Sequence, residues 1–253
     1  MILVFKLFLT PFFIALVSLT GRRWGPDASG WLMGLPLSSG PISIILALQY
    51  GPDFAARSAI GNLGGQASVC VFCLAYSLAS RKSGWLISSF AAVGAFLVST
   101  FLWNYFSLAL LPALAALLAV IFLVSRLIPD EPASVQSFTP PKWDLPARMV
   151  IAALFVVALT TFANLIGPQL SGLIAPFPVF GVILAAFTHK QQGAKSATRL
   201  VRGIVVGSLG FTTFFLVVAY LLPLTGILVT YLLAAFAAVG LNAILYFKFL
   251  QKS

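Results

Sequence analysis

The sequence predicts an all-α, polytopic membrane protein, and three observations support that class. Of the 253 residues, 60% are hydrophobic and 8% are charged, and the mean hydropathy is +1.06. An average soluble domain has about 25% charged residues, so this chain cannot cover a surface that faces water. Its apolar runs approach the roughly 20 residues of a membrane-crossing helix, about twice the length of a barrel strand. A soluble globular chain, a disordered chain and a collagen-like chain are therefore excluded.

Apolar runs between polar residues predict about nine membrane-crossing helices. Their ranges are 3–21, 27–50, 54–79, 84–103, 105–128, 147–166, 169–187, 201–222 and 225–247. We expect the first range to stay in the mature protein, because it has neither a preceding basic segment nor an A-x-A cleavage pattern. The one long linker, 129–146, is rich in proline and polar residues. The polar stretch around His189 is predicted to be a cytoplasmic loop.

The net charge of +10 predicts the orientation of the chain in its membrane. With nine spans, 13 of the 15 Lys and Arg residues fall on one side, and only Lys6 and Arg57 fall on the other. Cytoplasmic loops carry the excess of basic residues. We therefore expect a protein of the cell inner (plasma) membrane with its N-terminus outside and its C-terminus in the cytoplasm. The basic residues are not clustered with aromatics on a soluble face, so a nucleic-acid partner is not expected.

An internal repeat divides the chain. When the sequence is shifted by 142 residues, 11 of the 41 positions in 25–65 are identical to those in 167–207, where composition alone gives roughly three. The matches are mainly Gly, Pro, Gln and Arg, which argues against the general likeness of apolar helices. The predicted units are a four-helix repeat at 1–104, a connecting helix and linker at 105–146, and a second four-helix repeat at 147–253. Five helices separate equivalent positions, so the two repeats are predicted to have inverted topology, as in many secondary transporters.

The second helix of each repeat is interrupted near its middle. Proline removes a backbone donor and breaks a helix, and in lipid such a break is tolerated only where it faces protein or a water-filled cavity. Paired broken helices at equivalent positions point to a substrate site at the membrane midplane, although two kinks that only improve packing explain the pattern equally well. The candidate binding residues at the breaks are Pro36, Ser38, Ser39 and Gly40 in the first repeat and Pro176, Pro178 and Gly181 in the second.

The segment 171–180, SGLIAPFPVF, resembles the GlpM-like small inner-membrane proteins, which have four predicted helices and a G-L-x-x-x-F-P-x-F signature. Gly172, Leu173, Phe177, Pro178 and Phe180 match that signature. The first repeat keeps the proline but has Leu and Ser in place of the two phenylalanines. The resemblance covers about 80 residues of the second repeat and implies two GlpM-like units fused through an extra helix, the second upside down. The family's loose association with glycerol metabolism and exopolysaccharide output implies no mechanism.

Four polar residues complete the candidate site. Arg57 and Arg199 are equivalent in the repeats and are predicted to lie at opposite membrane faces. They are interpreted either as interfacial anchors or as a symmetric pair that attracts an anionic headgroup or solute. Asn62 and Gln66 lie four residues apart, on one face of a helix, and are costly to bury. Asp27 is expected to cap a helix N-terminus, and Gly61-x-x-x-Gly65 and Gly203-x-x-x-Gly207 are expected to be packing steps.

Three functions remain open at this point. The first is a small secondary transporter or facilitator of a neutral or anionic solute, since no Asp or Glu lies inside a predicted span. The second is a lipid or lipid-linked-sugar translocase, and the third is a non-transporting subunit of an envelope polysaccharide system. No catalytic motif is present, so we expect no enzyme, no cofactor and no metal site. The expected partners are membrane lipid and an unidentified substrate, with a homodimer left open.

Overall fold

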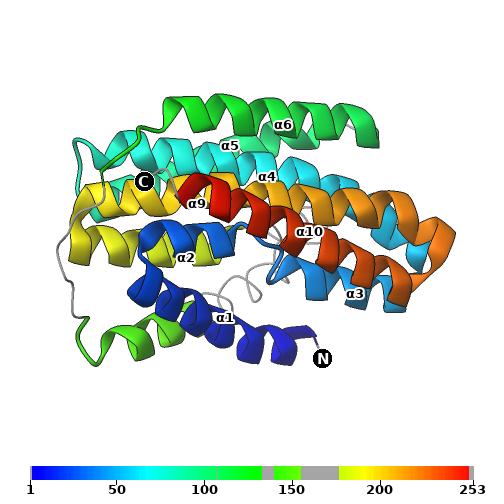
Figure 1. Cartoon of the computed structure of the whole chain (residues 1–253), viewed down its shortest axis with the longest axis horizontal. Helices are drawn as coiled ribbons and strands as arrows, with labels where there is room; N and C mark the ends of the chain where they lie inside the picture. Colours follow the sequence, from blue (N-terminus) through cyan, green and yellow to red (C-terminus); the bar gives the residue numbers. More distant parts are fainter. Residues whose placement is uncertain (1, 107, 133–139, 155–176, 251–253) are drawn as a thin grey trace.

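The structure is a computed structural model that describes residues 2–106, 108–132, 140–154 and 177–250 (Figure 1). This part of the chain contains helices and no strand, which confirms the all-α class. The helices are α1 (Ile2–Trp24), α2 (Pro26–Met33), α3 (Ser39–Tyr50), α4 (Pro52–Ser80), α5 (Trp85–Asn104), α6 (Leu110–Leu127), α9 (Val179–Thr225) and α10 (Ile227–Leu250). A further helix occupies 144–154. The remainder of the predicted span 147–166 and the first part of 169–187 lie outside the described residues.

Five of the described helices, α4, α5, α6, α9 and α10, are long and apolar enough to cross a membrane. Large apolar side chains point outward from them, such as Phe90, Leu111 and Phe236, which are 70–75% exposed. Patches of this kind are rare on soluble monomers but are the normal surface of a helix that faces lipid. The structure therefore fits an integral membrane protein. The number of nine spans stays a prediction.

Two glycines at equivalent positions end one helix and start the next. Gly51, between α3 and α4, has φ 89° and ψ 166°, and Gly193, within α9, has φ 86° and ψ 172°. A side chain is strained at these positive φ angles, so the shared turn depends on glycine in both halves. Gly193 divides α9 into a first part, 179–192, and a second part, 194–225. The predicted loop around His189 is therefore wrong: the polar stretch is helical on both sides of the turn.

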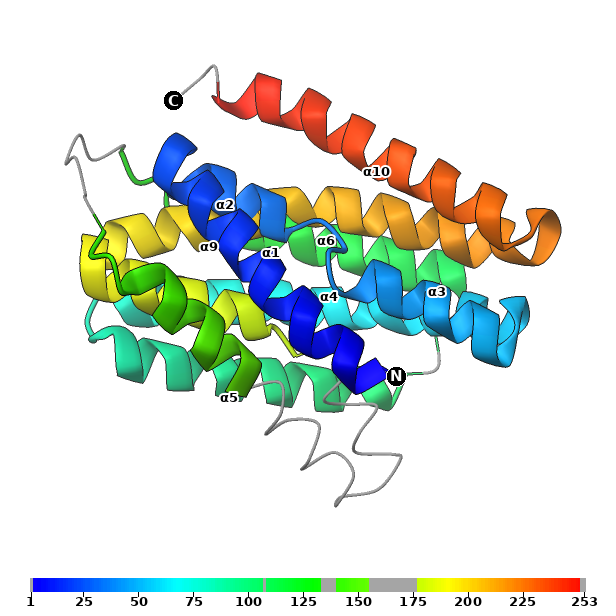
Figure 2. The same cartoon turned by 90° about the horizontal axis from the view of Figure 1, so that it is seen from below.

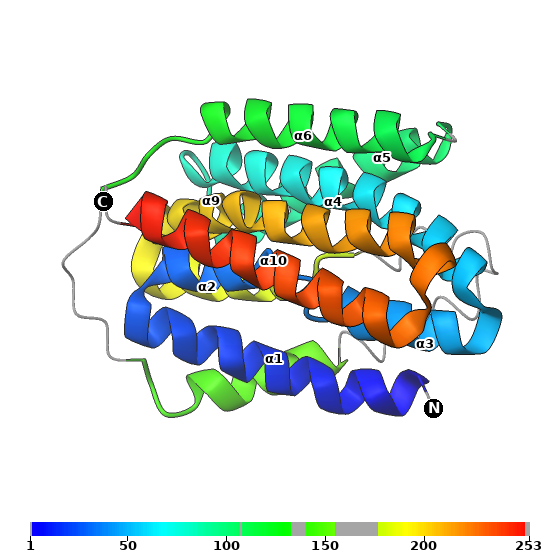
Figure 3. The same ribbon diagram turned by 45° about the vertical axis from the view of Figure 1, so that its right-hand side comes forward.

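Helices that are equivalent in the two halves run in opposite directions. α4 starts at the end of the bundle that contains Gly51, and the second part of α9 starts at the other end, at Gly193 (Figure 1). Figure 3 shows α1 beginning near the first of these ends and α10 finishing at the other. We call the end at Gly193 the basic end, because Arg22, Arg81 and Arg126 also lie at the helix ends there.

The centre of the bundle is formed by α4 and α9, which share the most extensive helix–helix contact. α2 packs on the second part of α9, and α1 crosses the bundle diagonally (Figure 2). Glycines on both helices form the contact between α2 and α9. A Cβ atom on Gly30 or Gly34 would collide with the backbone of Leu200 or Gly207. The absence of side chains at such positions lets two helices approach backbone to backbone.

Candidate functional site

The first helix break lies between Met33, the last residue of α2, and Ser39, the first of α3. Leu37 N–H donates to the carbonyl of Leu35 at 2.8 Å, and Gly40 N–H donates to the carbonyl of Pro36 at 2.9 Å. The break is shorter than the sequence suggested, because Gly40 already belongs to the first turn of α3. The side chain of Ser38 is exposed, so it does not line the interior of the bundle.

The second break repeats this backbone geometry at the start of α9. Val179 N–H donates to the carbonyl of Phe177 at 2.8 Å, and Val182 N–H donates to the carbonyl of Pro178 at 2.9 Å. Both bonds join positions exactly 142 residues beyond those of the first break, and Pro178 is the counterpart of Pro36. Pro176 lies outside the described residues.

The first helical turn after each break packs against a phenylalanine of the opposite half. A Cβ atom on Gly40 would lie 3.3 Å from the Phe214 ring, and one on Gly181 would lie 3.4 Å from the Phe72 ring. Phe72 and Phe214 are equivalent in the repeat, and both are buried. The same Cβ on Gly181 would lie 3.9 Å from the Met33 side chain. The structure therefore places the end of α2, just before the first break, close to the start of α9, just after the second.

The two predicted polar residues of α4 do not act as a pair. Asn62 donates to the carbonyl of Ser58, one turn back on its own helix, at 3.0 Å. Gln66 is buried and donates through Nε2 to the Ser208 hydroxyl at 2.5 Å. Ser208 is the repeat counterpart of Gln66, 142 residues away, so equivalent positions touch at the centre of the α4–α9 interface.

Arg57 and Arg199 are not a symmetric pair. Arg57 is exposed near the start of α4, whereas Arg199 is mostly buried and forms an ion pair with Asp27. The expectation that Asp27 caps a helix is also wrong. Gly25 is the N-cap of α2, and Asp27 lies within the first helical turn, where it neutralises Arg199.

A buried ionic cluster at the basic end was not predicted. Asp144 accepts hydrogen bonds from Arg22 at 2.8 Å, from Arg148 at 3.0 Å and from Gln191 at 2.6 Å. Arg148 also donates to Gln191 at 3.1 Å and lies over the Phe187 ring. The Asp144 side chain is 1% exposed and that of Arg148 is 7% exposed. Burial alone would raise the pKa of the Asp144 carboxyl, but the bonds from Gln191 and Arg22 and the charge of Arg148 lower it below its usual value.

Two features of the sequence could have indicated this cluster. Asp144 and Arg148 are four residues apart, the spacing of an ion pair on one helix face. Gln191 is identical to its repeat counterpart, Gln49. No sequence pattern indicated that Arg22 joins this cluster, because Arg22 lies 122 residues before Asp144 in the chain.

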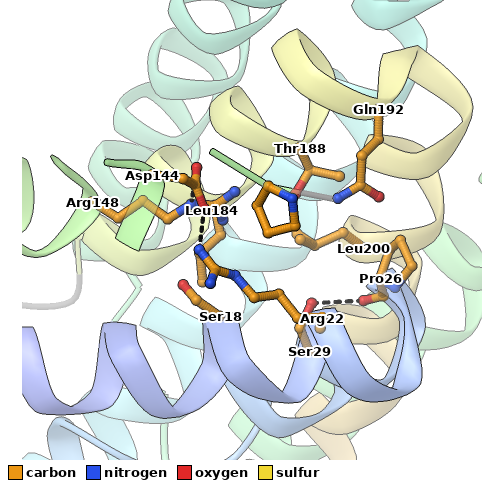
Figure 4. A pocket seen from close by; sticks show the side chains of 12 residues that line it. Ser18, Arg22, Pro26, Ser29, Asp144, Arg148, Leu184, Thr188, Gln192 and Leu200 are labelled. Atoms are coloured by element: carbon orange, nitrogen blue, oxygen red, sulfur yellow. Dashed lines mark hydrogen bonds and ion pairs between the residues drawn. The ribbon is translucent and has the colours of Figure 1, made fainter. Parts of the chain in front are cut away.

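A small hollow opens beside this cluster, between α1, α2, the helix at 144–154 and α9. Figure 4 shows Ser18 and Arg22 of α1, Thr188 of α9 and Asp144 around it. It lies at the basic end and does not include the residues of the two breaks. The Ser18 hydroxyl is buried and has no hydrogen-bond partner among the described residues.

No family model matches the chain, and comparison with curated proteins and with solved structures gives no significant match. The resemblance to GlpM-like proteins therefore stays a prediction. The class that the fold defines is a helical protein of the membrane.

Proposed function

We propose that this protein is a small secondary transporter or facilitator that carries a neutral or anionic solute past its two broken helices by alternating access. One observation carries the proposal. The breaks at Gly34–Ser38 and Phe177–Pro178 have the same pair of backbone hydrogen bonds, and the helix residues beside them, Met33 and Gly181, lie close together. Unwound backbone at membrane depth is tolerated where it is covered by protein or lines a cavity, and transporters place their sites there. We assign no enzymatic activity to it.

The relation between the halves supports an inverted repeat. α4 and the second part of α9 run in opposite directions, and equivalent residues lie on the same local features: Gly51 and Gly193 at the turns, Phe72 and Phe214 at the breaks. The Gln66–Ser208 bond lies where a pseudo-two-fold axis would pass. Two similar halves that rock about such an axis would expose a central site to each side in turn.

The ionic cluster supports a state that is closed at the basic end. Arg22 belongs to the first half, whereas Arg148 and Gln191 belong to the second, and Asp144 binds all three. Opening this end would separate Arg22 from Asp144. The lipid-translocase alternative gains no support. It requires two comparable arginines that each bind a lipid headgroup, one at each membrane face, but Asp27 already neutralises Arg199.

The test is solute flux in proteoliposomes that contain the full chain, with labelled neutral polyols and labelled small anions. We expect saturable flux of at least one solute. Gly181→Leu should abolish it, because the larger side chain would fill the space beside the second break, next to Phe72 and Met33. Gly61→Leu is the matched control: Gly61 is exposed, with nothing within 4 Å among the described residues. Absence of flux for every solute would favour the non-transporting subunit instead.

We also propose that the basic end faces the cytoplasm and that the membrane is the inner (plasma) membrane, following the excess of basic residues in cytoplasmic loops. Single cysteines at Phe54, near the start of α4, and at Lys82, just beyond its end, test the orientation, since both positions are exposed. Cys70 and Cys73 are buried and should label little. A membrane-impermeant maleimide should label position 54 and spare position 82 in intact cells. The reverse pattern would invert the orientation.

A further inference from the structure

The hollow at the basic end carries an excess of positive charge. Arg22 and Arg148 face a single carboxylate, Asp144, so the cluster has a formal charge of about +1. Arg199 of α9 is already paired with Asp27 of α2. The Arg148 guanidinium is occupied by Asp144, Gln191 and the Phe187 ring. Arg22, by contrast, uses one nitrogen on Asp144 and keeps 31% of its side chain exposed.

Two hydroxyls line the same hollow. Ser18 precedes Arg22 by four residues, so the two side chains lie on one face of α1. Ser18 is 4% exposed, and its hydroxyl has no partner within the described part of the chain. Thr188 is 3% exposed and approaches from α9. A buried hydroxyl without a partner is unusual in proteins, and a water or an ion bound beside it is one of the ordinary explanations.

We propose that this hollow binds a small oxyanion, such as inorganic phosphate or a phosphate headgroup, through Arg22 with the hydroxyls of Ser18 and Thr188. Guanidinium and hydroxyl groups donate hydrogen bonds, and an arginine with free N–H groups suits the paired oxygens of phosphate. The hollow is small and partly open, with room for about one water-sized group, so it admits an oxygen of the anion but not an extended solute. The idea that this anion is the transported solute, bound at the basic end, rests on the proposed function. Anion binding itself does not.

The experiment uses the full chain in phosphatidylcholine nanodiscs. Inorganic phosphate is titrated at constant ionic strength, with binding followed by calorimetry and by the unfolding temperature. We expect saturable binding that falls at least tenfold in Arg22→Gln. Arg23→Gln is the matched control, since Arg23 is the next residue, carries the same charge and lies over Trp24 instead. Its binding should remain within twofold of the parent protein.

Ser18→Ala separates binding from folding. Without phosphate this variant should unfold at the same or a higher temperature, because it removes a buried hydroxyl that has no partner, while its phosphate affinity should fall severalfold. Thr20→Ala is its control, since the Thr20 hydroxyl bonds within α1. Equal losses in Arg22→Gln and Arg23→Gln, or unchanged binding in both Arg22→Gln and Ser18→Ala, would overturn the proposal.

The source of the anion is decided by repeating the titration in nanodiscs that contain phosphatidylglycerol. Competition by this lipid supports the site and assigns it to a headgroup, whereas unchanged phosphate binding supports the site and assigns it to a free anion. Flux without phosphate binding would remove this inference and leave the transporter proposal standing. Binding without flux of any solute would support this inference and remove the transporter proposal.

Discussion

Gly203 and Gly61 occupy equivalent positions in the two halves of the chain, yet their surroundings differ. A Cβ atom on Gly203 would lie 2.5 Å from the carbonyl oxygen of Asp27, whereas one on Gly61 would meet no described residue within 4 Å. The neighbouring arginines differ in the same way, with Arg199 paired to Asp27 and Arg57 exposed. A shared backbone plan therefore does not imply shared contacts.

The two ends of the bundle show the same contrast on a larger scale. The basic end holds the buried cluster of Arg22, Asp144 and Arg148. At the opposite end, Asp53 and Arg57 are both exposed near the start of α4. Separating charges that are buried together leaves them uncompensated, whereas exposed charges are screened by water. We therefore expect the basic end to cost more to open than the opposite end.

The largest effect is expected at Asp144. Asp144→Asn removes the negative charge and leaves the buried Arg148 without its counter-charge, and breaking one side of a buried ion pair costs about 3–5 kcal/mol. Asp53→Asn removes an exposed charge at the opposite end and should change stability by less than about 0.5 kcal/mol. The free energy of unfolding in mixed micelles measures both. Equal, small effects would mean that the cluster does not fasten the basic end.

The same carboxylate predicts how stability depends on pH. The pKa of Asp144 is lowered in the folded protein, so its contribution is present above the ordinary Asp pKa of about 3.9 and is lost as the pH falls through the lower folded value. The parent protein should lose more stability below about pH 4 than Asp144→Asn does. Parallel pH profiles for the two proteins would remove Asp144 as the source.

The next largest effect separates the equivalent glycines. Gly203→Ala should destabilise the protein by about 1–3 kcal/mol, because the added methyl group forces α2 away from α9. Gly61→Ala should be neutral or stabilising by up to about 1 kcal/mol, since alanine is the better helix former and the position is open. The difference between the two unfolding free energies is the measurement. Similar values would show that the α2–α9 contact can relax at little cost.

The two breaks and the turns between them were accessible from the sequence, because they depend on backbone rules that glycine and proline carry with them. Pro36 and Pro178 indicated the breaks, and the identity of Gly51 and Gly193 marked the repeat whose turns the structure shows. The contacts were not accessible, because they depend on which distant segment packs where. The partners Arg22 and Asp144 are 122 residues apart, and neither local sequence indicates that the two segments are in contact.

The repeat itself misled the interpretation of single side chains. Identity of Arg57 and Arg199 predicted equal roles, but within the described residues Arg199 is the one of the two that pairs with an aspartate, Asp27. The sequence does not repeat that aspartate, because the counterpart of position 27 is a glutamine. The spacing of Asn62 and Gln66 predicted a joint polar site. Gln66 instead is buried and bonds across to Ser208, whereas Asn62 bonds its own helix.

A smaller effect is expected from the arginines. Arg199→Gln should cost about 1 kcal/mol, because it breaks a partly buried ion pair and leaves Asp27 beside α9 without a counter-charge, whereas Arg57→Gln should change the unfolding free energy by less than about 0.5 kcal/mol. The double variant Arg199→Gln/Asp27→Asn should recover part of the loss, since it leaves neither charge alone. A loss in Arg57→Gln as large as that in Arg199→Gln would restore the symmetric interpretation of the pair.

The smallest effect distinguishes the two polar residues of α4. Gln66→Leu removes the bond to Ser208 at the centre of the bundle, and hydrogen bonds between membrane helices contribute about 0.6 kcal/mol on average. Asn62→Leu removes only a bond within α4, so its effect should be nearer zero. Because the leucine at position 66 also leaves the Ser208 hydroxyl its bond to the carbonyl of Ile204 at 2.8 Å, no buried donor is stranded, which keeps the loss small. A loss well above 2 kcal/mol in Gln66→Leu would mean that the contact between Gln66 and Ser208 holds the two halves together. The main stabilising contact between the halves would then lie at the centre of the bundle rather than at its basic end.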